Sequence, residues 1–372
     1  MEARLVWIDV PMSVSAQKVS KEKSIEANAV DSAEAAEEAG LRYVTDDRPG
    51  YTRKANGHHF QYLDIEGKRI RDEQRLLRIK RLAIPPAWTD VWICPSPNGH
   101  LQATGRDARR RKQYRYHDRW REIRDENKFE RLVDFAKALP QIRKRVDHDI
   151  KLPGLPREKV LATVVRLLER TFMRIGNEEY ARENKSFGLT TMKDRHVTVK
   201  GARLRFRFRG KSGRQHEVDV TDRRIADIVA KLDDLPGQDL FQYFDDDGNL
   251  SDVASHDVND YLREISGDNF TAKDFRTWAG TVLAAIALNT QEEFQSQKEA
   301  KANVKNAICA VAELLGNTPA ICRKCYVHPA LFEAYLTKSR IPGVSEATKK
   351  LKASQFKSAE TAVLRFLASR RA

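Results

Sequence analysis

The spacing of apolar residues changes along the chain, and this change limits the possible folds more than any other feature of the sequence. Between residues 41 and 104, apolar and polar residues tend to alternate, which is typical of half-buried strands. After Arg119 the period becomes helical. One such helical stripe consists of Val160, Leu161, Val164, Val165, Leu168 and Phe172. The sequence therefore predicts an α+β protein with a small, mainly β N-terminal domain and a larger, mainly helical domain.

A second β region interrupts the helical part of the chain. It consists of three alternating runs, at residues 196–200, 204–208 and 216–220, separated by turns that contain glycine. These runs predict a three-stranded insert whose second turn, RGKSGRQ, is unusually basic. In the N-terminal domain, an Asn-Gly pair between the runs at 91–94 and 100–104 predicts a hairpin.

Composition and pattern divide the chain into four parts. Residues 1–40 carry 4 basic and 8 acidic residues without a sustained period, and they are expected to form an acidic tail. The β-rich domain is expected over residues 41–120, and the helical domain over residues 121–343. A basic helical extension is expected over residues 344–372, and we expect its charge to add affinity for a polyanionic partner.

The sequence lacks the features of membrane and secreted proteins. No apolar run approaches the roughly 20 residues that a membrane-spanning helix needs. The apolar stretch at the start of the sequence is too short for a secretory signal. The 4 cysteines of this 372-residue chain do not suggest a disulfide framework. We therefore expect a cytoplasmic protein that has no membrane partner.

Charge gives the first indication of a partner. The chain has 67 basic and 53 acidic residues, a formal net charge of +14. Between Arg106 and Arg124 there are 9 basic and 3 acidic residues. A positive field of this density favours a polyanion, and nucleic acid is the commonest polyanion in a cytoplasm. Charge alone leaves a solvated basic surface as the alternative.

Four residues could carry chemistry on a phosphate group. Lys211 lies in the basic turn, where a P-loop would require glycine in place of Arg205, so nucleotide binding is not expected. Arg174 and Arg276 follow large apolar residues, and a guanidinium group matches phosphate in shape, although a lone arginine more often forms a surface ion pair. Tyr326 could pack in the core, stack on DNA or act as a nucleophile.

The CxxC pair formed by Cys322 and Cys325 is a weaker candidate. A zinc site would need a second pair or two histidines, and only His328 lies near in the sequence. A redox pair normally opens a helix in a βαβ unit, which the pattern does not predict. We expect neither a metal site nor a redox function here.

Six segments, taken in their order, resemble type IB DNA topoisomerases of the poxvirus and bacterial kind. The resemblance covers roughly residues 41–343. The segments are QATGRDARRRKQYRYH (102–117), FMRIGNEEY (172–180), ENKSFGLTTMKDRHV (183–197), FRGKSGRQHE (208–217), KDFRTWAGT (273–281) and LLGNTPAICRKCY (314–326). The resemblance implies a tyrosine-recombinase-like catalytic domain. It also implies an enzyme that relaxes supercoiled duplex DNA by cutting one strand, letting it swivel and resealing it.

The resemblance further implies roles for single residues. Tyr326 would be the nucleophile that forms a 3′-phosphotyrosyl intermediate, and Lys211 would protonate the departing 5′ oxygen. Arg174, Arg276 and Asn317 would bind the non-bridging oxygens of the transition state. The viral enzymes have histidine where this chain has Asn317, and an amide can donate a hydrogen bond but no proton. Because the phosphotyrosine keeps the bond energy, no cofactor, ATP or metal is expected.

Two segments match the DNA-contacting parts of the family. In the β-rich domain, aromatic and basic side chains are expected to contact DNA together. These residues are Arg109, Arg110, Arg111, Lys112, Tyr114 and Tyr116. Asn177 and Tyr180 match positions on a groove-facing helix, although Asn177 replaces a basic viral residue and Tyr180 could instead pack in the core. The expected enzyme is a monomer that closes around duplex DNA as a clamp, in the bacterial nucleoid.

Two other functions compete with this interpretation. A tyrosine recombinase would share the tyrosine and the arginine pair, but it typically carries an HxLRH-like box where this chain has KDFRTW. The β-type N-terminal domain also argues against a recombinase. A DNA-binding architectural protein without catalysis would be expected to lack part of the residue set, and that set is intact in this sequence.

Overall fold

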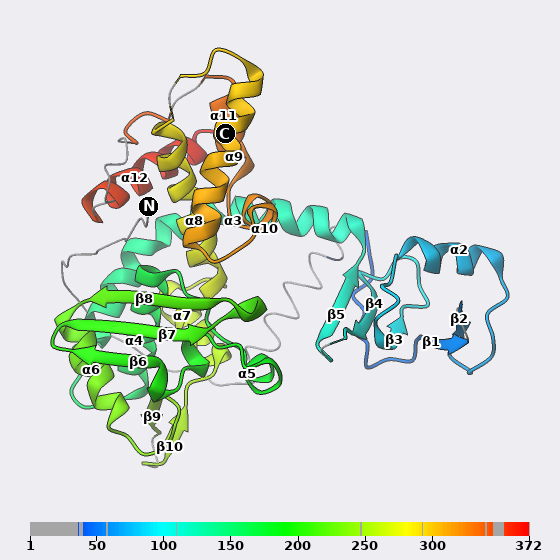
Figure 1. The fold of residues 1–372 in the computed structure, drawn as a ribbon, viewed down its shortest axis with the longest axis horizontal. Helices are drawn as coiled ribbons and strands as arrows, with labels where there is room; N and C mark the ends of the chain where they lie inside the picture. The colour runs from blue at the N-terminus through cyan, green and yellow to red at the C-terminus, as the bar shows by residue number, and fades with distance from the viewer. Residues whose placement is uncertain are drawn as a thin grey trace. The chain divides into compact units, whose positions relative to one another are not determined.

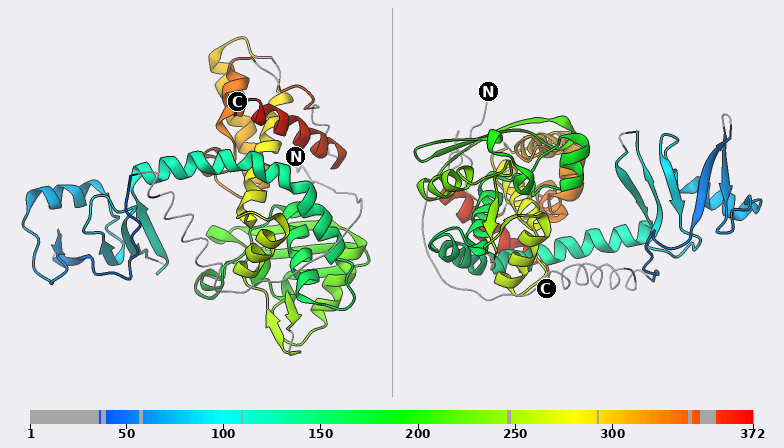
Figure 2. Two further views of the ribbon diagram at one scale, coloured as in Figure 1. Left: turned by 180° about the vertical axis from the view of Figure 1, so that it is seen from behind. Right: turned by 90° about the horizontal axis from the view of Figure 1, so that it is seen from below.

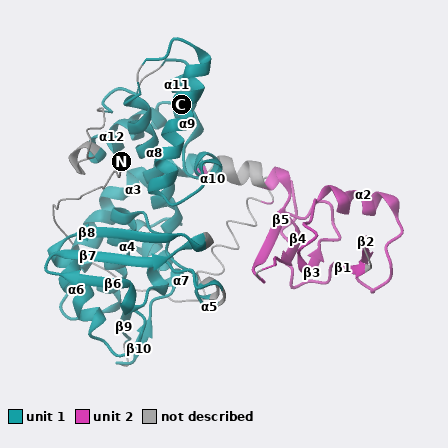
Figure 3. Ribbon diagram, in the orientation of Figure 1, with its two compact units in different colours: residues 1–21, 129–372 teal, residues 22–128 magenta. Residues whose placement is uncertain are grey.

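The chain forms two compact units in the computed structural model (Figures 1 and 3), divided between residues 128 and 129. The structure describes residues 36, 40–56, 59–108, 110–245, 248–291, 293–338, 341–344 and 353–371. The β-rich smaller unit and the mainly helical larger unit confirm the predicted α+β class. No helix in the described ranges is long and apolar enough to cross a membrane.

The smaller unit contains a five-stranded antiparallel sheet with the strand order β2-β1-β3-β4-β5. Its strands are β1 (Tyr51–Asn56), β2 (His59–Leu63), β3 (Thr89–Ile93), β4 (Leu101–Arg106) and β5 (Lys112–Tyr116). β3 and β4 form the predicted hairpin, with Trp92 opposite Thr104. Helix α2 (Glu73–Arg81) buries Ile79 in a small apolar cluster with Tyr51 and Val91.

The larger unit is built around helix α8 (Ala272–Asn289), whose side chains are buried over most of its length. The other helices are α3 (Asp118–Asp149, which starts in the smaller unit), α4 (Arg157–Thr171), α5 (Glu178–Asn184), α6 (Arg223–Asp233), α7 (Ser255–Ser266), α9 (Gln297–Leu314), α10 (Pro319–Cys325), α11 (Pro329–Leu336) and α12 (Ala353–Ala368). α4, α9, α11 and α12 all contact α8, and the views of Figures 1 and 2 show α9 and α12 beside it. A short hairpin pairs β9 (Gln242–Phe244) with β10 (Leu250–Asp252).

The predicted three-stranded insert is present as an antiparallel sheet in the order β6-β7-β8 (Figure 1). Its strands are β6 (Val197–Lys200), β7 (Arg203–Arg209) and β8 (Gln215–Thr221). Leu204, Phe206 and Phe208 alternate along β7 and are buried, on a sheet that α6 and α4 contact. The intervening arginines pair across the strands with carboxylates of β8, as Arg205 does with Asp219 at 2.7 Å. The alternation in sequence thus becomes one apolar and one charged face.

The residues of the predicted apolar stripe on α4 are buried in the main core, but burial extends beyond a stripe, because every residue from Lys159 to Leu168 is buried. The helix ends at Phe172, whose backbone is left-handed with a φ of 55°. A left-handed residue at this position ends a helix because the next amide points away from the helical ladder. The chain therefore leaves α4 two residues before Arg174.

Helix α12 packs into the larger unit through one apolar face. The buried residues of this face are Phe356, Ala359, Ala362, Val363 and Leu367. Glu360 lies on the same helix and is 7% exposed. Its carboxylate accepts hydrogen bonds from Nη2 of Arg143 at 2.9 and 3.0 Å and from the indole of Trp278 at 2.8 Å. A carboxylate can be buried here because three donated hydrogen bonds compensate its lost hydration.

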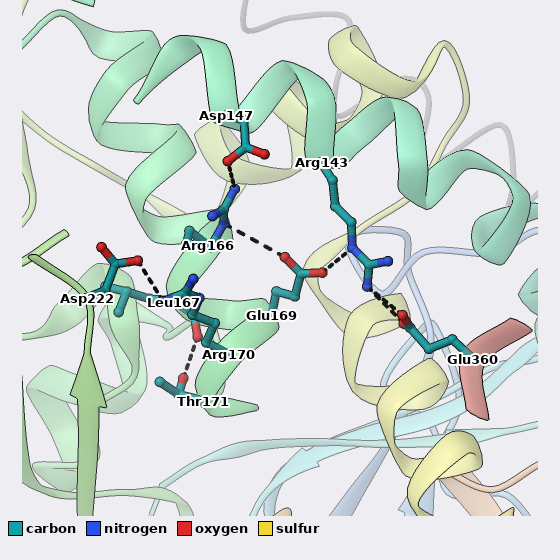
Figure 4. A network of polar contacts seen from close by, with 9 residues as sticks. All are labelled: Arg143, Asp147, Arg166, Leu167, Glu169, Arg170, Thr171, Asp222 and Glu360. Atoms are coloured by element: carbon teal, nitrogen blue, oxygen red, sulfur yellow. Dashed lines mark hydrogen bonds and ion pairs between the residues drawn. The ribbon is translucent and has the colours of Figure 1, made fainter. Parts of the chain in front are cut away.

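A chain of ion pairs extends from Glu360 through α3 and α4 (Figure 4). Arg143 binds Glu169 at 2.5 Å, and Arg166 lies 3.9 Å from the same carboxylate. Burial acts to raise the pKa of Glu169, but Arg143 and Arg166 together hold that pKa below its ordinary value. Arg166 also pairs with Asp147. The network therefore fastens α12 to the helices that precede Arg174.

Candidate active site

Arg174 is held by the backbone of a neighbouring segment. Its carbonyl oxygen accepts a hydrogen bond from the amide of Leu189 at 2.9 Å. A side chain at Gly188 would place its Cβ 2.6 Å from that oxygen, so the approach requires glycine. The two segments FMRIGN and FGLTT therefore lie against each other, and Arg174 extends from a backbone fixed on both sides.

The Arg174 guanidinium reaches the loop that follows α9. Its Nη2 atom donates to the carbonyl oxygen of Gly316 at 3.1 Å and to the amide oxygen of Asn317. Asn317 is buried, and its backbone amide donates to the carbonyl oxygen of Ala312 at 2.8 Å. With its oxygen engaged, the Nδ2 donor of Asn317 has no hydrogen-bond partner among the described residues. A buried donor in this state can receive an oxygen of a ligand.

Arg276 lies on α8 and is 4% exposed. Its Nη1 atom donates to the carbonyl oxygen of Phe172, and Nη2 donates to that of Leu315 at 2.8 Å. Its Nε donor has no partner in the part of the chain that the structure describes. The guanidinium carbon lies 5.1 Å from the centre of the Tyr326 ring. Arg276 thus connects the end of α4, the end of α9 and Tyr326.

Tyr326 follows α10, whose first turn is capped by the side chain of Thr318. Its ring is partly buried against the main core. Its carbonyl oxygen accepts a hydrogen bond from Oγ1 of Thr281 at 3.4 Å. A Cβ atom at Gly280 would lie 2.5 Å from the same oxygen, so α8 approaches the backbone of Tyr326 closely. Arg276 and Gly280 are one helical turn apart on α8, and both face the tyrosine.

The two arginines form a positive cluster. Their guanidinium groups donate to backbone carbonyls and to the amide oxygen of Asn317, Arg276 also interacts with the side chain of Tyr326, and no carboxylate of the described residues is among the acceptors. Burial, and then repulsion by Arg276, lower the pKa of Arg174 to about 10. Burial lowers the pKa of Arg276, whereas a negative charge on Tyr326 would raise that pKa. Arg174 stays protonated at neutral pH, and this positive charge favours an anion beside the tyrosine.

Lys211 occupies the predicted position at the tip of the β7–β8 hairpin, in the 3₁₀ turn Lys211–Gly213. Its side chain is exposed, and it takes no part in the hydrogen bonds described above. The hairpin itself reaches the cluster, because Nη1 of Arg214 donates to the carbonyl oxygen of Asn317 at 3.5 Å. The structure therefore brings Arg174, Arg276, Asn317 and Tyr326 together and places Lys211 on an adjoining hairpin.

His216 on β8 also belongs to this region, although no pattern in the sequence points to it. Its ring stacks on Phe208, with centroids 5.1 Å apart and planes 12° from parallel. Burial lowers the pKa of His216, as do the nearby guanidinium groups of Arg174, Arg276 and Arg214. Arg214 and Glu217, which lie close to His216 in the sequence, are charged and exposed. The sequence pattern around His216 is therefore that of an exposed turn and does not indicate its partial burial.

The aromatic residues predicted to bind DNA lie on β5 of the smaller unit. Tyr114 is 46% exposed, and its ring stacks on Tyr116 with centroids 5.9 Å apart. The ammonium group of Lys112 lies 5.7 Å from the centre of the Tyr114 ring and pairs with Asp46 at 2.7 Å. Tyr116 is half-buried and also stacks on Trp120, with centroids 4.4 Å apart, so Tyr114 is the exposed ring of the pair. An exposed aromatic ring with an adjacent cation suits contact with a nucleic-acid strand.

The remaining predicted DNA contacts differ in how they are placed. Arg111 pairs with Asp107 at 2.6 Å, so part of its charge is neutralised. Arg110 has a φ of 58° in the turn before β5. Asn177 precedes α5 and is exposed. Tyr180 lies on α5, but its side chain is outside the described part of the structure, as is Arg109 altogether.

The CxxC pair lies on α10, immediately before Tyr326. Both cysteines are free, and burial raises the pKa of Cys322 to about 11. In the described ranges, no group of three or more histidine, cysteine or acidic side chains is arranged to hold a metal ion.

Comparison with known proteins identifies the family. Residues 117–355 match the family described as eukaryotic DNA topoisomerase I, catalytic core, and residues 59–107 match the bacterial DNA topoisomerase IB N-terminal domain. DNA topoisomerase 1B of Acanthamoeba polyphaga mimivirus is 34% identical over 293 residues, which cover 77% of this chain and 87% of the viral protein. DNA topoisomerase 1B of Vaccinia virus (strain Copenhagen) is 23% identical over 277 residues, 73% of this chain and 85% of that protein. The chain therefore belongs to the type IB DNA topoisomerases of the poxvirus and bacterial kind.

Proposed function

We propose that Tyr326 cuts one strand of duplex DNA and that the nick is used to relax supercoils. The tyrosine oxygen forms a bond to phosphorus, and the bond between phosphorus and the 5′ oxygen breaks. The phenolic proton passes to solvent, and the departing oxygen takes a proton from Lys211. The product is a 3′-phosphotyrosyl enzyme and a free 5′-hydroxyl end. After the strand swivels, that hydroxyl reverses the reaction, so the ester bond energy is kept and ATP is not consumed.

The observation that carries this proposal is the positive cluster around Tyr326. The transition state at phosphorus gathers negative charge on its non-bridging oxygens, and fixed donors stabilise such charge most effectively. Arg276 and Asn317 each present a buried donor that lacks a partner among the described residues. Arg174 adds a guanidinium group that is already oriented by Gly316 and Asn317. Together these three residues supply donors for the non-bridging oxygens of a phosphate.

Lys211 is assigned as the general acid because of its place on the hairpin. A lysine on an exposed turn can reach into bound DNA, whereas the arginines are held by backbone carbonyls. General acid catalysis of this kind contributes about 10²- to 10⁴-fold to a rate. Loss of Lys211 should therefore slow strand cleavage by a factor in that range.

The test is relaxation of negatively supercoiled plasmid in EDTA, without ATP, by the wild type and by Tyr326→Phe. Wild type should relax the plasmid and leave a detergent-trapped adduct at the 3′ end of the cut strand. Tyr326→Phe should do neither. The matched control is Tyr335→Phe, which removes one hydroxyl that accepts a hydrogen bond from Asn303 on α9. This control should relax DNA normally, and relaxation by Tyr326→Phe at the wild-type rate would refute the assignment.

We further propose that one chain acts as a monomeric clamp on supercoiled DNA in the nucleoid. The support is the exposed ring of Tyr114 beside Lys112 on β5 of the smaller unit, which offers contacts beyond those of the catalytic cluster. Sedimentation of the enzyme on a short duplex should give one chain per DNA. Two chains per active complex would contradict the proposal. A fluorescent fusion should coincide with the DNA stain in bacterial cells.

A further inference from the structure

The His216 ring is inserted between two glycines that are distant in sequence. A Cβ atom added at Gly210 would lie 2.6 Å from Cδ2 of His216 and 2.7 Å from Nε2. A Cβ atom added at Gly316 would lie 2.6 Å from Cε1 of the same ring. The imidazole tip therefore occupies space that side chains at Gly210 and Gly316 would need.

The imidazole ring of His216 explains why residue 210 is a glycine. Gly210 has a φ of −94° and a ψ of −168°, an extended conformation that any residue can adopt. Gly316 has a φ of 61°, so its backbone favours glycine independently of His216. At Gly210 the histidine is thus the steric reason for glycine, and the two residues form a matched pair.

The two glycines lie directly before two residues of the proposed mechanism. Gly210 precedes Lys211, and Gly316 precedes Asn317. Contact through His216 therefore joins the turn that carries the lysine to the loop that carries the asparagine. Phe208, which is 6% exposed, stacks on the imidazole face and fixes the plane of the ring.

The ring fits this place in its neutral form. Three guanidinium groups, those of Arg174, Arg276 and Arg214, act with burial to lower the pKa of His216. A neutral imidazole adds no fourth positive charge to the cluster. The contact is therefore a steric one, between the flat imidazole ring and the backbone of Gly210 and Gly316.

We infer that His216 is a positioning residue for the strand-cleavage step: it seats the hairpin against the Gly316–Asn317 loop so that Lys211 meets the departing 5′ oxygen. This inference rests on the proposed role of Lys211 as the general acid. Proton transfer requires heavy atoms within about 3 Å, so a small shift of the turn is enough to weaken it. His216 itself neither gives nor takes a proton in this step.

The test compares two leaving groups at one cleavage site, mapped beforehand from wild-type adducts. One duplex has the natural 5′ oxygen at that site, and the other has a bridging sulfur, which leaves as a thiolate and needs no proton. Single-turnover cleavage is measured for each duplex. His216→Ala should cut the oxygen duplex about ten- to a hundredfold more slowly than wild type. It should cut the sulfur duplex within about threefold of wild type, because only proton delivery is impaired.

Two further variants address the steric contact. Gly210→Ala pushes on the ring without removing it, and it should show the same selective loss on the oxygen duplex. His216→Phe keeps a flat ring and should retain cleavage of the oxygen duplex within about threefold. The double variant Gly210→Ala/His216→Ala should be no slower than His216→Ala, because the added methyl group then meets no ring. Thermal unfolding of each variant checks that the fold is retained.

Lys211→Ala separates failure of this inference from failure of the proposed function. If Lys211→Ala is slow on oxygen and normal on sulfur, the lysine is the acid, and the results for His216 then judge the inference alone. In that case, equal slowing of both duplexes by His216→Ala or by Gly210→Ala would overturn the positioning role. If Lys211→Ala is equally slow on both duplexes, the lysine is not the acid, and both the proposal and the inference fall.

Discussion

Gly280 lies against the carbonyl oxygen of Tyr326, with room for a hydrogen but none for a methyl group. A Cβ atom at Gly280 would be 2.5 Å from that oxygen and 3.0 Å from the tyrosine Cβ. The residue stands inside α8, where glycine normally costs about 1 kcal/mol relative to alanine. The helix therefore accepts an unfavourable residue where it approaches the proposed nucleophile.

Gly280→Ala is expected to slow strand cleavage by at least about tenfold, because the new methyl group displaces Tyr326 from the arginines. Helix propensity alone would stabilise this variant by about 1 kcal/mol, so any fall in melting temperature reports the clash. Single-turnover cleavage and thermal unfolding measure the two effects. The control is Gly267→Ala, at the left-handed end of α7 in open space, which should lower stability and leave cleavage unchanged. Normal cleavage by Gly280→Ala would show that this contact does not position the tyrosine.

Glu360→Gln is expected to lower the free energy of unfolding by about 2–4 kcal/mol. It removes one charge from a buried pair and leaves Arg143 with Glu169 as its remaining partner. Urea unfolding followed by tryptophan fluorescence provides the measurement. The matched control is Glu333→Gln, whose partner Arg370 and own side chain are both exposed, and it should change stability by less than about 1 kcal/mol. Equal effects of the two variants would contradict the structural role of Glu360.

The cysteines should differ sharply in reactivity. The pKa of Cys322 is raised to about 11, so on the order of 0.1% of it is thiolate at pH 8, whereas Cys309 is exposed. Iodoacetamide should label Cys309 at least about 100 times faster than Cys322. Labelling of Cys322 should accelerate about tenfold per pH unit as pH rises from 8 to 10, because the thiolate fraction grows with pH below the pKa. Mass spectrometry of the native chain checks this, and rapid labelling of Cys322 at pH 8 would contradict it.

The expected contribution of residues 344–372 to DNA binding is best tested on the surface of α12. Deletion would expose the core that Phe356 covers, so substitution of exposed charges is the cleaner change. Lys357→Gln with Arg365→Gln should make the slope of log K against log salt shallower by about 1–2, since each phosphate contact contributes about 0.9. The charge-preserving pair Lys357→Arg and Arg365→Lys should leave the slope unchanged. An unaltered slope in the glutamine variant would remove these side chains from the DNA-binding surface.

The sequence predicted those elements whose apolar residues face a core. Burial alternates along β7 of the three-stranded insert, and it is continuous over residues 159–168 of α4 and residues 101–105 of β4. Helix α2 was not predicted, because Ile79 is the one fully buried residue of its nine. Strand β5 was not predicted either, since KQYRY has no fully buried position and pairs at the edge of its sheet. Pattern reasoning depends on burial, and these two elements have little.

The proposed catalytic residues came from family resemblance, and their geometry could not be read from spacing. Arg174 and Asn317 are 143 positions apart, yet they share a hydrogen bond. His216 illustrates the same limit, because Gly316, one of the two glycines that border its ring, stands 100 positions later in the sequence. Contacts of this kind depend on how α4, α8 and α9 pack, and no local period encodes them.

Helix α12 follows every residue of the proposed catalytic cluster in the chain, and this order has a consequence during protein synthesis. When Tyr326 has left the ribosome, Arg143 and Trp278 do not yet have the carboxylate of Glu360 as their hydrogen-bond acceptor. The apolar residues that α12 covers are still exposed at that stage. The contacts of Glu360 with α3 and α8 can form only after α12 has also emerged. A nascent chain would thus complete the core beneath α12 last, after every residue of the proposed catalytic cluster has been synthesised.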